Sequence, residues 1–185
     1  MSITLFLIFL MLFTFAIQDS FNLLPYFSFI PHYAIVQPWR FVTSIFLHAN
    51  FPHLFYNILA LFFFGHYLER IISKKSFLLI FFLSGIFGNL LFFLTTSNAL
   101  SLAVGASGAI YGIVGALAAL RPFAIVYVYF TPVPLITMAF IWAFLSFLGI
   151  FVPSNIAHAA HFSGLVTGYV LGRYIGERGR KFKRG

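Results

Sequence analysis

Long stretches almost free of charged residues recur along the whole chain, and they restrict it to one kind of environment. Hydrophobic residues make up 62% of the 185 positions, 28 positions are phenylalanine, and only 8% are charged. A soluble domain carries about 25% charged residues, so the composition predicts an integral membrane protein. The sequence has no cysteine, which excludes disulfides, cysteine-ligated zinc and thiol catalysis.

A helix needs roughly 20 mostly apolar residues to cross the hydrocarbon core of a bilayer, and six such spans are expected. They cover about residues 2–17, 51–72, 76–94, 106–120, 133–151 and 157–176. We therefore predict an all-α fold, a bundle of six transmembrane helices. It forms a single domain over residues 1–185 that ends in a short basic tail at about 173–185. The first span lacks the basic start and cleavage site of a signal peptide, so we expect it to be a transmembrane helix.

The basic residues are divided unequally between the two sides of this six-span arrangement. Ten of the eleven Lys and Arg residues fall on one side, and Arg40 alone falls on the other. The positive-inside rule then places both termini in the cytoplasm of a multi-pass protein of the cell membrane, plasma or inner. Membrane lipids are expected partners of the basic tail, and nucleic acid is not needed to explain the net charge of +8.

The segment between the first two spans, residues 21–40, is too apolar for an ordinary loop. We expect part of it to dip into the outer membrane interface. Trp39 and Arg40 are expected to anchor it at the level of the lipid headgroups, as amphipathic side chains do.

Acidic residues are scarce, and this excludes several kinds of membrane protein. Asp19, Glu69 and Glu177 all lie near the ends of predicted spans. The absence of an aspartate in mid-membrane excludes a two-aspartate intramembrane protease, and the absence of His-Glu-x-x-His excludes that type of zinc protease. An ion-coupled transporter would usually carry an acidic residue within the membrane. A haem or metal protein that uses the six histidines is an alternative, but no cofactor or metal is expected.

The remaining polar residues gather at one depth of the predicted bundle. Ser, His and Asn side chains occur near the outer ends of the second, fourth and sixth spans, namely His48, His53, Asn57, Ser107, Asn155, His158 and His161. Core polar residues that were independent of one another would have no reason to share a depth. The pattern therefore predicts one polar site at the outer face, built from three helices.

Glycines explain how these helices would meet. They follow i, i+4, i+7 spacing on the fourth span and i, i+3, i+7 spacing from a histidine on the sixth; these residues are Gly108, Gly112, Gly115, His161, Gly164 and Gly168. Small residues let helix backbones approach closely in lipid. Ser107 itself is either one more small packing residue or a nucleophile within reach of His161. Tyr111, one turn below Ser107, is expected to stack on the His161 ring.

Here the chain resembles the rhomboid intramembrane serine proteases. The resemblance rests on Gly-x-Ser-Gly with a tyrosine four residues after the serine, on Ala-His-x-x-Gly-x-x-x-Gly, on two histidines and an asparagine in the second span, on Trp-Arg before it and on Glu-Arg near its end. In this sequence these positions are Gly105, Ser107, Gly108, Tyr111, Ala160, His161, Gly164, Gly168, His48, His53, Asn57, Trp39, Arg40, Glu69 and Arg70. The resemblance covers essentially the whole chain and implies a minimal six-helix core.

The resemblance implies a Ser-His dyad in place of the soluble Ser-His-Asp triad. Ser107 would attack the scissile carbonyl while His161 accepts and later returns its proton. His53, Asn57 and the Ser107 backbone N–H would stabilise the oxyanion. His158 is an alternative base, three residues before His161.

The resemblance also implies the substrates and the supporting residues. Single-span transmembrane proteins would be cut near the outer membrane face, after lateral access between the second and fifth spans, with Tyr56 and Trp142 as gate residues. His48 is expected to brace the first outer loop by hydrogen bonding. The oligomeric state is left open. The alternative function is a catalytically inactive relative that binds and escorts membrane proteins.

Overall fold

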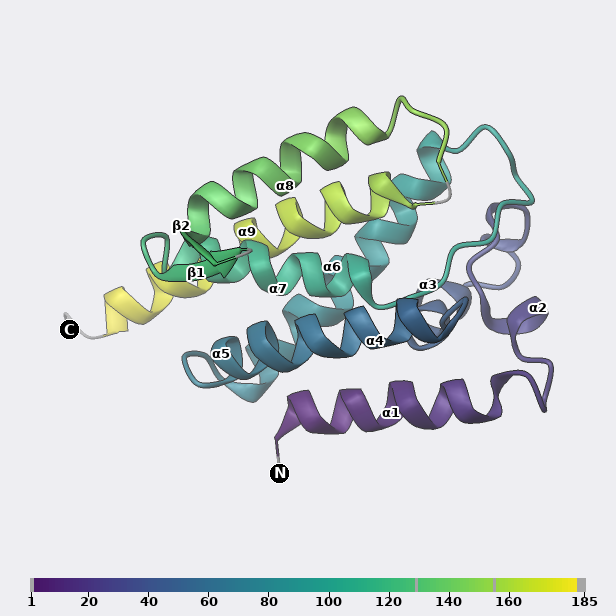
Figure 1. Cartoon of the computed structure of the whole chain (residues 1–185), viewed down its shortest axis with the longest axis horizontal. Helices are drawn as coiled ribbons and strands as arrows, with labels where there is room; N and C mark the ends of the chain where they lie inside the picture. Colours follow the sequence, from purple (N-terminus) through teal and green to yellow (C-terminus); the bar gives the residue numbers. More distant parts are fainter. Residues whose placement is uncertain (1, 129, 155, 183–185) are drawn as a thin grey trace.

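Apolar helices run side by side between two ends of the molecule (Figure 1). The structure is a computed structural model that describes residues 2–128, 130–154 and 156–182, without the side chains of residues 178–182. The longer helices are α1 (Ile3–Gln18), α4 (Phe51–Ala60), α6 (Lys74–Thr95), α7 (Ser107–Leu120), α8 (Leu135–Gly149) and α9 (His158–Phe182). We call the end of the bundle with the start of α1 and the end of α9 the inner end, and the end with the starts of α4, α7 and α9 the outer end.

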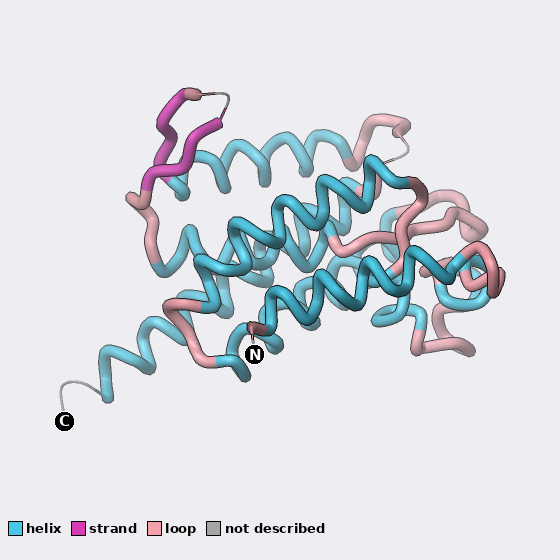
Figure 2. Tube along the Cα trace, turned by 60° about the horizontal axis from the view of Figure 1, so that its bottom comes forward, coloured by secondary structure: helices cyan, strands magenta, loops and turns pink. Residues whose placement is uncertain are grey.

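Short elements connect these helices. The π-helical turn η3 (Leu61–Gly65) and α5 (His66–Glu69) continue α4 toward the inner end. The outer segment between α1 and α4 folds into α2 (Leu24–Phe27), η1 (Pro31–Tyr33), α3 (Arg40–Thr43) and η2 (Ser44–Phe46). Figure 2 shows these pieces as short helices joined by loops, beside the regular helices of the bundle.

Each of the six expected spans corresponds to a helix or a helical run, but two boundaries differ clearly from the prediction. The second run ends at Glu69 rather than at residue 72, and α9 continues through the expected basic tail to Phe182. Among the described residues, α6 is long and apolar enough to cross a membrane by itself, and the pair Arg40–Phe46 and Phe51–Glu69, bent by 94°, would supply a second crossing. The helices α1, α7 and α8 are apolar but shorter, so six crossings stay a prediction.

The bundle is mostly helical, as predicted, and one short β-hairpin that was not predicted lies between α7 and α8. Strands β1 (Ile125–Val128) and β2 (Thr131–Pro134) pair antiparallel, with Ile125 opposite Pro134 and Val128 opposite Thr131. β-branched and aromatic residues favour this extended form. A proline disfavours helical conformation in the residue before it, and α8 therefore begins at Leu135, after Pro134, rather than at residue 133.

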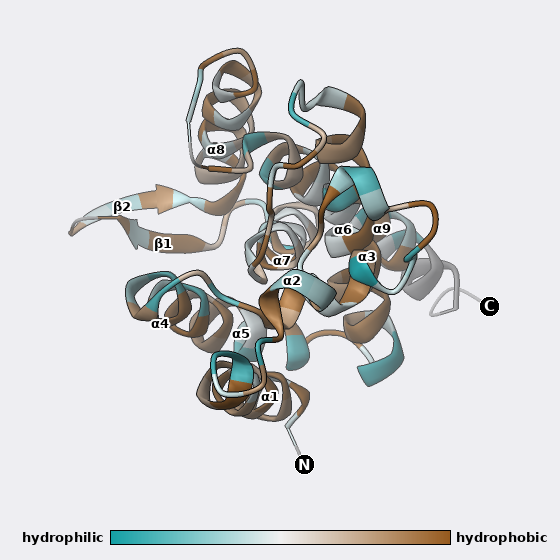
Figure 3. Ribbon diagram, turned by 90° about the vertical axis from the view of Figure 1, so that its right-hand side faces the viewer, coloured by the Kyte–Doolittle hydropathy of each residue, from teal (hydrophilic) through white to brown (hydrophobic). Residues whose placement is uncertain are grey.

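The core lies where α6, α7 and α9 pack together, and α7 makes its most extensive contacts with α9. Most residues of α7 from Gly108 to Ala118 are buried, and Ser84, Gly85 and Gly88 of α6 face this core. The helices α1, α4 and α8 lie around it and expose many large apolar side chains, as expected of surfaces that contact lipid. Figure 3 shows the hydrophobic colouring on these outer helices.

Glu69 joins the inner end of the second helical run to the start of α1. Its carboxylate accepts hydrogen bonds from the Ser2 hydroxyl (2.8 Å) and from the backbone N–H groups of Ile3 (2.7 Å) and Thr4 (3.1 Å). The first N–H groups of a helix have no intrahelical acceptor, and negative charge is favourable there. Glu69 therefore caps α1 and orients it against the bundle.

Replacing Glu69 with alanine should destabilise the protein, because the start of α1 would lose charged hydrogen bonds worth about 1.5–3 kcal/mol each. Unfolding in detergent, followed by circular dichroism, measures the loss. The matched control is Glu177→Ala, since Glu177 makes an exposed i,i+4 contact with Arg173 (3.3 Å) worth about 0.3–0.5 kcal/mol. Equal stability of the two variants would contradict the capping role.

Candidate active site

Ser107 and His161 form a hydrogen-bonded pair at the outer end of the bundle. The Oγ of Ser107 lies 2.7 Å from Nε2 of His161, across the contact between α7 and α9. Ser107 is the first residue of α7, so its hydroxyl stands at a helix start, where backbone N–H groups are free of intrahelical acceptors. Both side chains are half-buried. The arrangement suits an activated nucleophile and its base.

Tyr111 holds the orientation of the histidine ring. Its ring stacks on that of His161, with centroids 4.4 Å apart and planes 11° from parallel. The other neighbour of Tyr111 is Trp142 of α8, at 5.2 Å between ring centroids. Among the described residues, no carboxylate bonds to His161, and the contact that orients its ring is the stacking on Tyr111.

Glycines bring α7 and α9 close enough for the pair to form. A Cβ added at Gly164 would collide with the carbonyl oxygen of Gly108, and a Cβ at Gly168 would collide with that of Gly112. One turn further on, a Cβ at Gly172 would lie 2.8 Å from the Cα of Ala116. We call these three contacts the glycine seam. Any larger residue at its centre would force the helices apart, and with them Ser107 and His161.

His53 lies against the backbone just before the serine. Gly105 has a φ of +113°, which L side chains rarely adopt, and a Cβ there would stand 2.6 Å from the His53 ring. Asn50 begins α4 by accepting a hydrogen bond from the backbone N–H of His53 (2.9 Å), which sets the position of that ring. The imidazole therefore packs on the chain two residues before Ser107.

Asn57 lies one turn below His53 on α4 and is buried. Its amide nitrogen donates to the backbone carbonyl of His53 (2.8 Å), and its Oδ1 has no hydrogen-bond partner among the described residues. One N–H of the amide is thus engaged and one is left for another acceptor.

Ser44 and Asn89 support the loop that carries Gly105, and sequence reasoning missed both. The Ser44 carbonyl accepts from the Gly105 N–H (2.9 Å), and the Ser44 hydroxyl accepts from the side chain of Asn89 (2.9 Å). Asn89 also donates to the carbonyl of Phe41 (2.9 Å). These bonds connect α6, η2 and the segment before α7. The sequence feature that could have indicated Asn89 is that it is a polar residue in the middle of an otherwise apolar span.

His48 was expected to brace the first outer loop by hydrogen bonding, and the structure holds it by ring packing and by hydrogen bonds of its backbone. Its buried ring packs edge-on against the His53 ring at 5.2 Å, but neither ring nitrogen forms a hydrogen bond with the described residues. Its backbone is held instead, because Gln18 at the end of α1 donates to the His48 carbonyl (2.7 Å) and accepts from its N–H (3.2 Å). Gln18 is therefore a third supporting residue, after Ser44 and Asn89, that the sequence pattern did not reveal.

The expectation that Arg40 anchors the outer loop at the lipid headgroups is wrong. Its side chain is 2% exposed, and its guanidinium donates to the carbonyls of Ser28 (2.6 Å) and Pro25 (2.8 Å) and to the side chain of Gln37. A buried arginine with several acceptors organises a loop from within. Trp39 is half-exposed and donates to the carbonyl of Tyr26 (3.3 Å).

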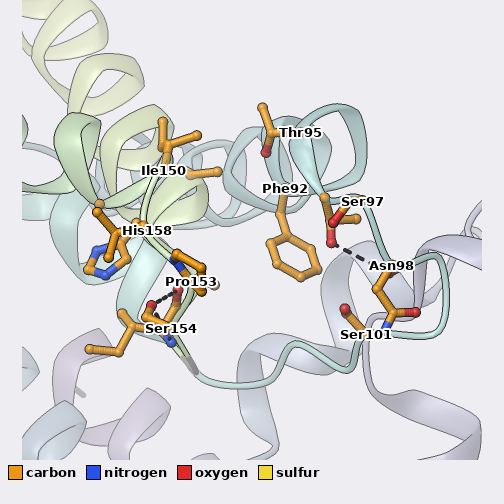
Figure 4. A pocket seen from close by; sticks show the side chains of 15 residues that line it. Phe92, Thr95, Ser97, Asn98, Ser101, Ile150, Pro153, Ser154 and His158 are labelled. Atoms are coloured by element: carbon orange, nitrogen blue, oxygen red, sulfur yellow. Dashed lines mark hydrogen bonds between the residues drawn. The ribbon is translucent and has the colours of Figure 1, made fainter.

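His158 lies beside the dyad but does not contact the serine. Its ring is 6.3 Å from that of His161, and it packs so closely on Gly149 that a Cβ there would collide with it. It borders a cavity of about 560 Å³ between residues 92–101 and 149–159, drawn in Figure 4, whose lining includes neither Ser107 nor His161. The cavity contains polar side chains of both loops, among them Asn98 and Ser154.

The remaining predicted site residues are Trp142, Tyr56 and Asn155. Trp142 stands next to Tyr111 and reaches Phe64 of η3 at 6.4 Å between ring centroids. Tyr56, on α4, is 67% exposed and points away from the core. Asn155 lies outside the described residues. Among those that are described, no group of three His, Asp or Glu residues is assembled to hold a metal ion.

Comparison with known protein families gives a match to the Rhomboid domain over residues 36–178. The chain belongs to the rhomboid family. It is therefore a membrane-embedded, mostly helical member of a family of intramembrane serine proteases. The rhomboid match includes every residue of the Ser107–His161 pair, the glycine seam and the His48–Asn57 segment.

Individual rhomboid relatives include active and inactive proteins by name. The chain is 37% identical over 135 residues to the putative rhomboid protease YdcA of Bacillus subtilis, which covers 72% of this chain and 65% of that protein. It is 44% identical over 92 residues to Rhomboid-like protease 3 of Toxoplasma gondii, covering 50% and 34% of the two chains. It is 40% identical over 79 residues to Inactive RHOMBOID-like protein 8 of Arabidopsis thaliana, covering 43% and 22%. The chain thus spans less than two thirds of the length of these relatives.

The glycine seam predicts a sharp difference between two glycines of the same helix. Gly168→Ala should destabilise the protein by at least about 1–3 kcal/mol, the usual effect of overpacking, and should separate Ser107 from His161. Gly176→Ala is the matched control, because its Cβ would meet only the end of the Leu120 side chain, and alanine favours a helix by about 1 kcal/mol. Unfolding in detergent measures both; a Gly168→Ala protein as stable as the control would contradict the seam.

Proposed function

We propose that this protein is an active serine endopeptidase that hydrolyses peptide bonds of transmembrane proteins through a Ser107–His161 dyad. The observation that carries the proposal is the 2.7 Å contact between the Ser107 hydroxyl and Nε2 of His161 in a member of the rhomboid family. Inactive members exist by name, so membership alone does not imply activity. Activity is supported by the presence of both dyad residues, with the His161 ring stacked on Tyr111.

The reaction follows from this geometry. Ser107 Oγ attacks the scissile carbonyl carbon as its proton passes to Nε2 of His161. The tetrahedral intermediate collapses to an ester on Ser107, and His161 gives the proton to the departing amine. A water molecule then attacks the ester and loses a proton to His161. As the ester bond breaks, His161 returns that proton to the Oγ of Ser107, which releases the acid product and the free serine. Tyr111 keeps the imidazole in one orientation through both steps.

The developing oxyanion would be held by the Ser107 backbone N–H, the His53 ring and the Asn57 amide. The Ser107 N–H is free because it belongs to the first turn of α7. The His53 ring is adjacent to Gly105, and Asn57 keeps one amide hydrogen available. Donors already in place need no reorganisation when charge develops, which is why they accelerate acyl transfer strongly.

The substrates would be single-span membrane proteins cut near the outer membrane face. In this topology six helices cross the membrane, both termini are cytoplasmic, and the dyad faces the extracellular or periplasmic side. The helices α4 and α8 stand on the same side of the bundle (Figure 3), where α8 exposes a row of phenylalanines. A substrate helix would approach between them, past Tyr56 and Trp142. Water would reach the ester from the polar outer loops.

The proposal is tested by a fluorophosphonate probe, which labels activated serines. Wild-type protein in detergent should react. Ser107→Ala should not react, and His161→Ala should react at least about 10²-fold more slowly, as expected for loss of a general base. His158→Ala should retain labelling; if His158→Ala lost labelling while His161→Ala kept it, His158 would be the base. A folded wild-type protein that stays unlabelled in both detergent and bilayers would favour the inactive escort.

Asn57→Ala should slow substrate cleavage by about 10²–10³-fold, because one oxyanion donor is worth about 2.7–4 kcal/mol. The loss should appear in kcat rather than in KM, since the oxyanion exists only in the transition state. Cleavage of a transmembrane reporter in proteoliposomes measures both constants. Asn98→Ala, in the outer loop, is the control. A change in KM with unchanged kcat would assign Asn57 to binding.

A further inference from the structure

The β1–β2 hairpin exposes apolar and aromatic side chains that the proposed function does not use. Its inward residues Val126 and Val128 pack against the core, whereas Ile125 and Tyr127 alternate with them and face outward. Phe123 before the hairpin and Phe130 at its turn are 81% and 97% exposed. The segment from residue 121 to residue 134 contains no acidic residue. A turn in water would not usually present these rings.

Phe130 also adopts an unusual backbone conformation. Its φ is +67°, a region in which glycine or asparagine is accommodated with less strain. A phenylalanine in this conformation destabilises the folded chain, and its ring does not offset the strain by packing because it is almost fully exposed. Its contribution must come from an environment outside the chain.

The place of the hairpin in the bundle indicates which environment this is. It lies at the inner end, after the last turn of α7, and projects sideways from the helices (Figures 2 and 3). Where side chains are described, the exposed basic residues of the inner end are Arg70, Lys74, Lys75, Arg121 and Arg173. Basic residues near a membrane surface attract anionic lipid headgroups, and aromatic rings gather at the same level.

The backbone of the hairpin restricts its depth. The sheet has two strands only, so the outer edge of each strand carries N–H and C=O groups without a partner strand. Hydrocarbon does not tolerate such open edges, because it offers no hydrogen bonds. The rings favour an apolar phase and the edges need polar partners. The headgroup layer supplies both.

We propose that the β1–β2 hairpin is a membrane-interface anchor that inserts Phe123, Tyr127 and Phe130 into the headgroup layer of the leaflet at the inner end of the bundle. The anchor has a consequence for α8. The backbone N–H groups of Leu135 and Ile136 bond to the carbonyls of Ala124 (2.9 Å) and Pro122 (3.0 Å), so a hairpin fixed at the interface also fixes the start of α8. The inference rests on the membrane topology of the proposed function and not on its chemistry.

The absence of cysteine in the chain allows a direct test with a single nitroxide label. Phe130→Cys is labelled and reconstituted in vesicles of phosphatidylcholine and phosphatidylglycerol. The accessibility of the label to oxygen and to a water-soluble nickel chelate gives its depth. Two reference sites bracket the scale, Phe140→Cys on the exposed face of α8 and Ser154→Cys in an exposed outer loop.

The label at residue 130 should give an accessibility ratio between those of the two references. A ratio equal to that of Ser154→Cys would place the hairpin in water, and a ratio equal to that of Phe140→Cys would place it in hydrocarbon; either result overturns the anchor. The labelled protein is also treated with the fluorophosphonate probe. If the serine reacts with the fluorophosphonate but the nitroxide at residue 130 is in water, only the anchor proposal is rejected. If the nitroxide is at the interface but the serine does not react, only the protease proposal is rejected.

Discussion

The close approach of α7 and α9 is the constraint on which the rest of the molecule depends. Lipid tails are as apolar as leucine, so these helices gain little from hydrophobic burial against each other and rely on backbone packing instead. Gly164 and Gly168 meet the carbonyls of Gly108 and Gly112 with no room for a methyl group. That fit determines the distance between a serine on one helix and a histidine on the other. The geometry of the Ser107–His161 pair is thus a consequence of helix packing.

A second set of contacts positions the segment that carries His53 beside this pair. Gly105 turns the chain into α7 with a positive φ, and His53 fills the space that any side chain there would occupy. Ser44 and Asn89 hold the turn from one side, and Gln18 holds the segment before α4 from the other. The first outer segment, itself organised around the buried Arg40, is therefore part of the scaffold of the site. Its apolar composition reflects this burial as well as any contact with lipid.

Much of the site could be predicted from residue types and spacing. Glycines at helical intervals, a serine and a histidine at the same depth and a tyrosine one turn away indicate a pair of facing helices, because small and polar residues have few other uses in an apolar span. The supporting residues were not predictable in this way. Ser44, Asn89 and Gln18 act through single hydrogen bonds to backbone groups far along the chain, and no local pattern reveals such partners. The headgroup role expected for Arg40 failed for the same reason, since its acceptors are carbonyls of a loop whose path the sequence does not show.

The sequence by itself determined the helical runs, the uneven distribution of charge and the cluster of Ser, His and Asn at one end, because hydrophobicity and helical period act locally. The glycine spacing of the sequence also favoured His161 over His158 as the partner of Ser107, and the structure places Nε2 of His161 2.7 Å from the Ser107 Oγ. Only the tertiary structure decided how the Gly105 turn meets His53, which partners Ser44, Asn89 and Gln18 bind, and that residues 125–128 pair with residues 131–134 as strands. These outcomes depend on contacts between segments far apart in the chain, which no local pattern of residues specifies.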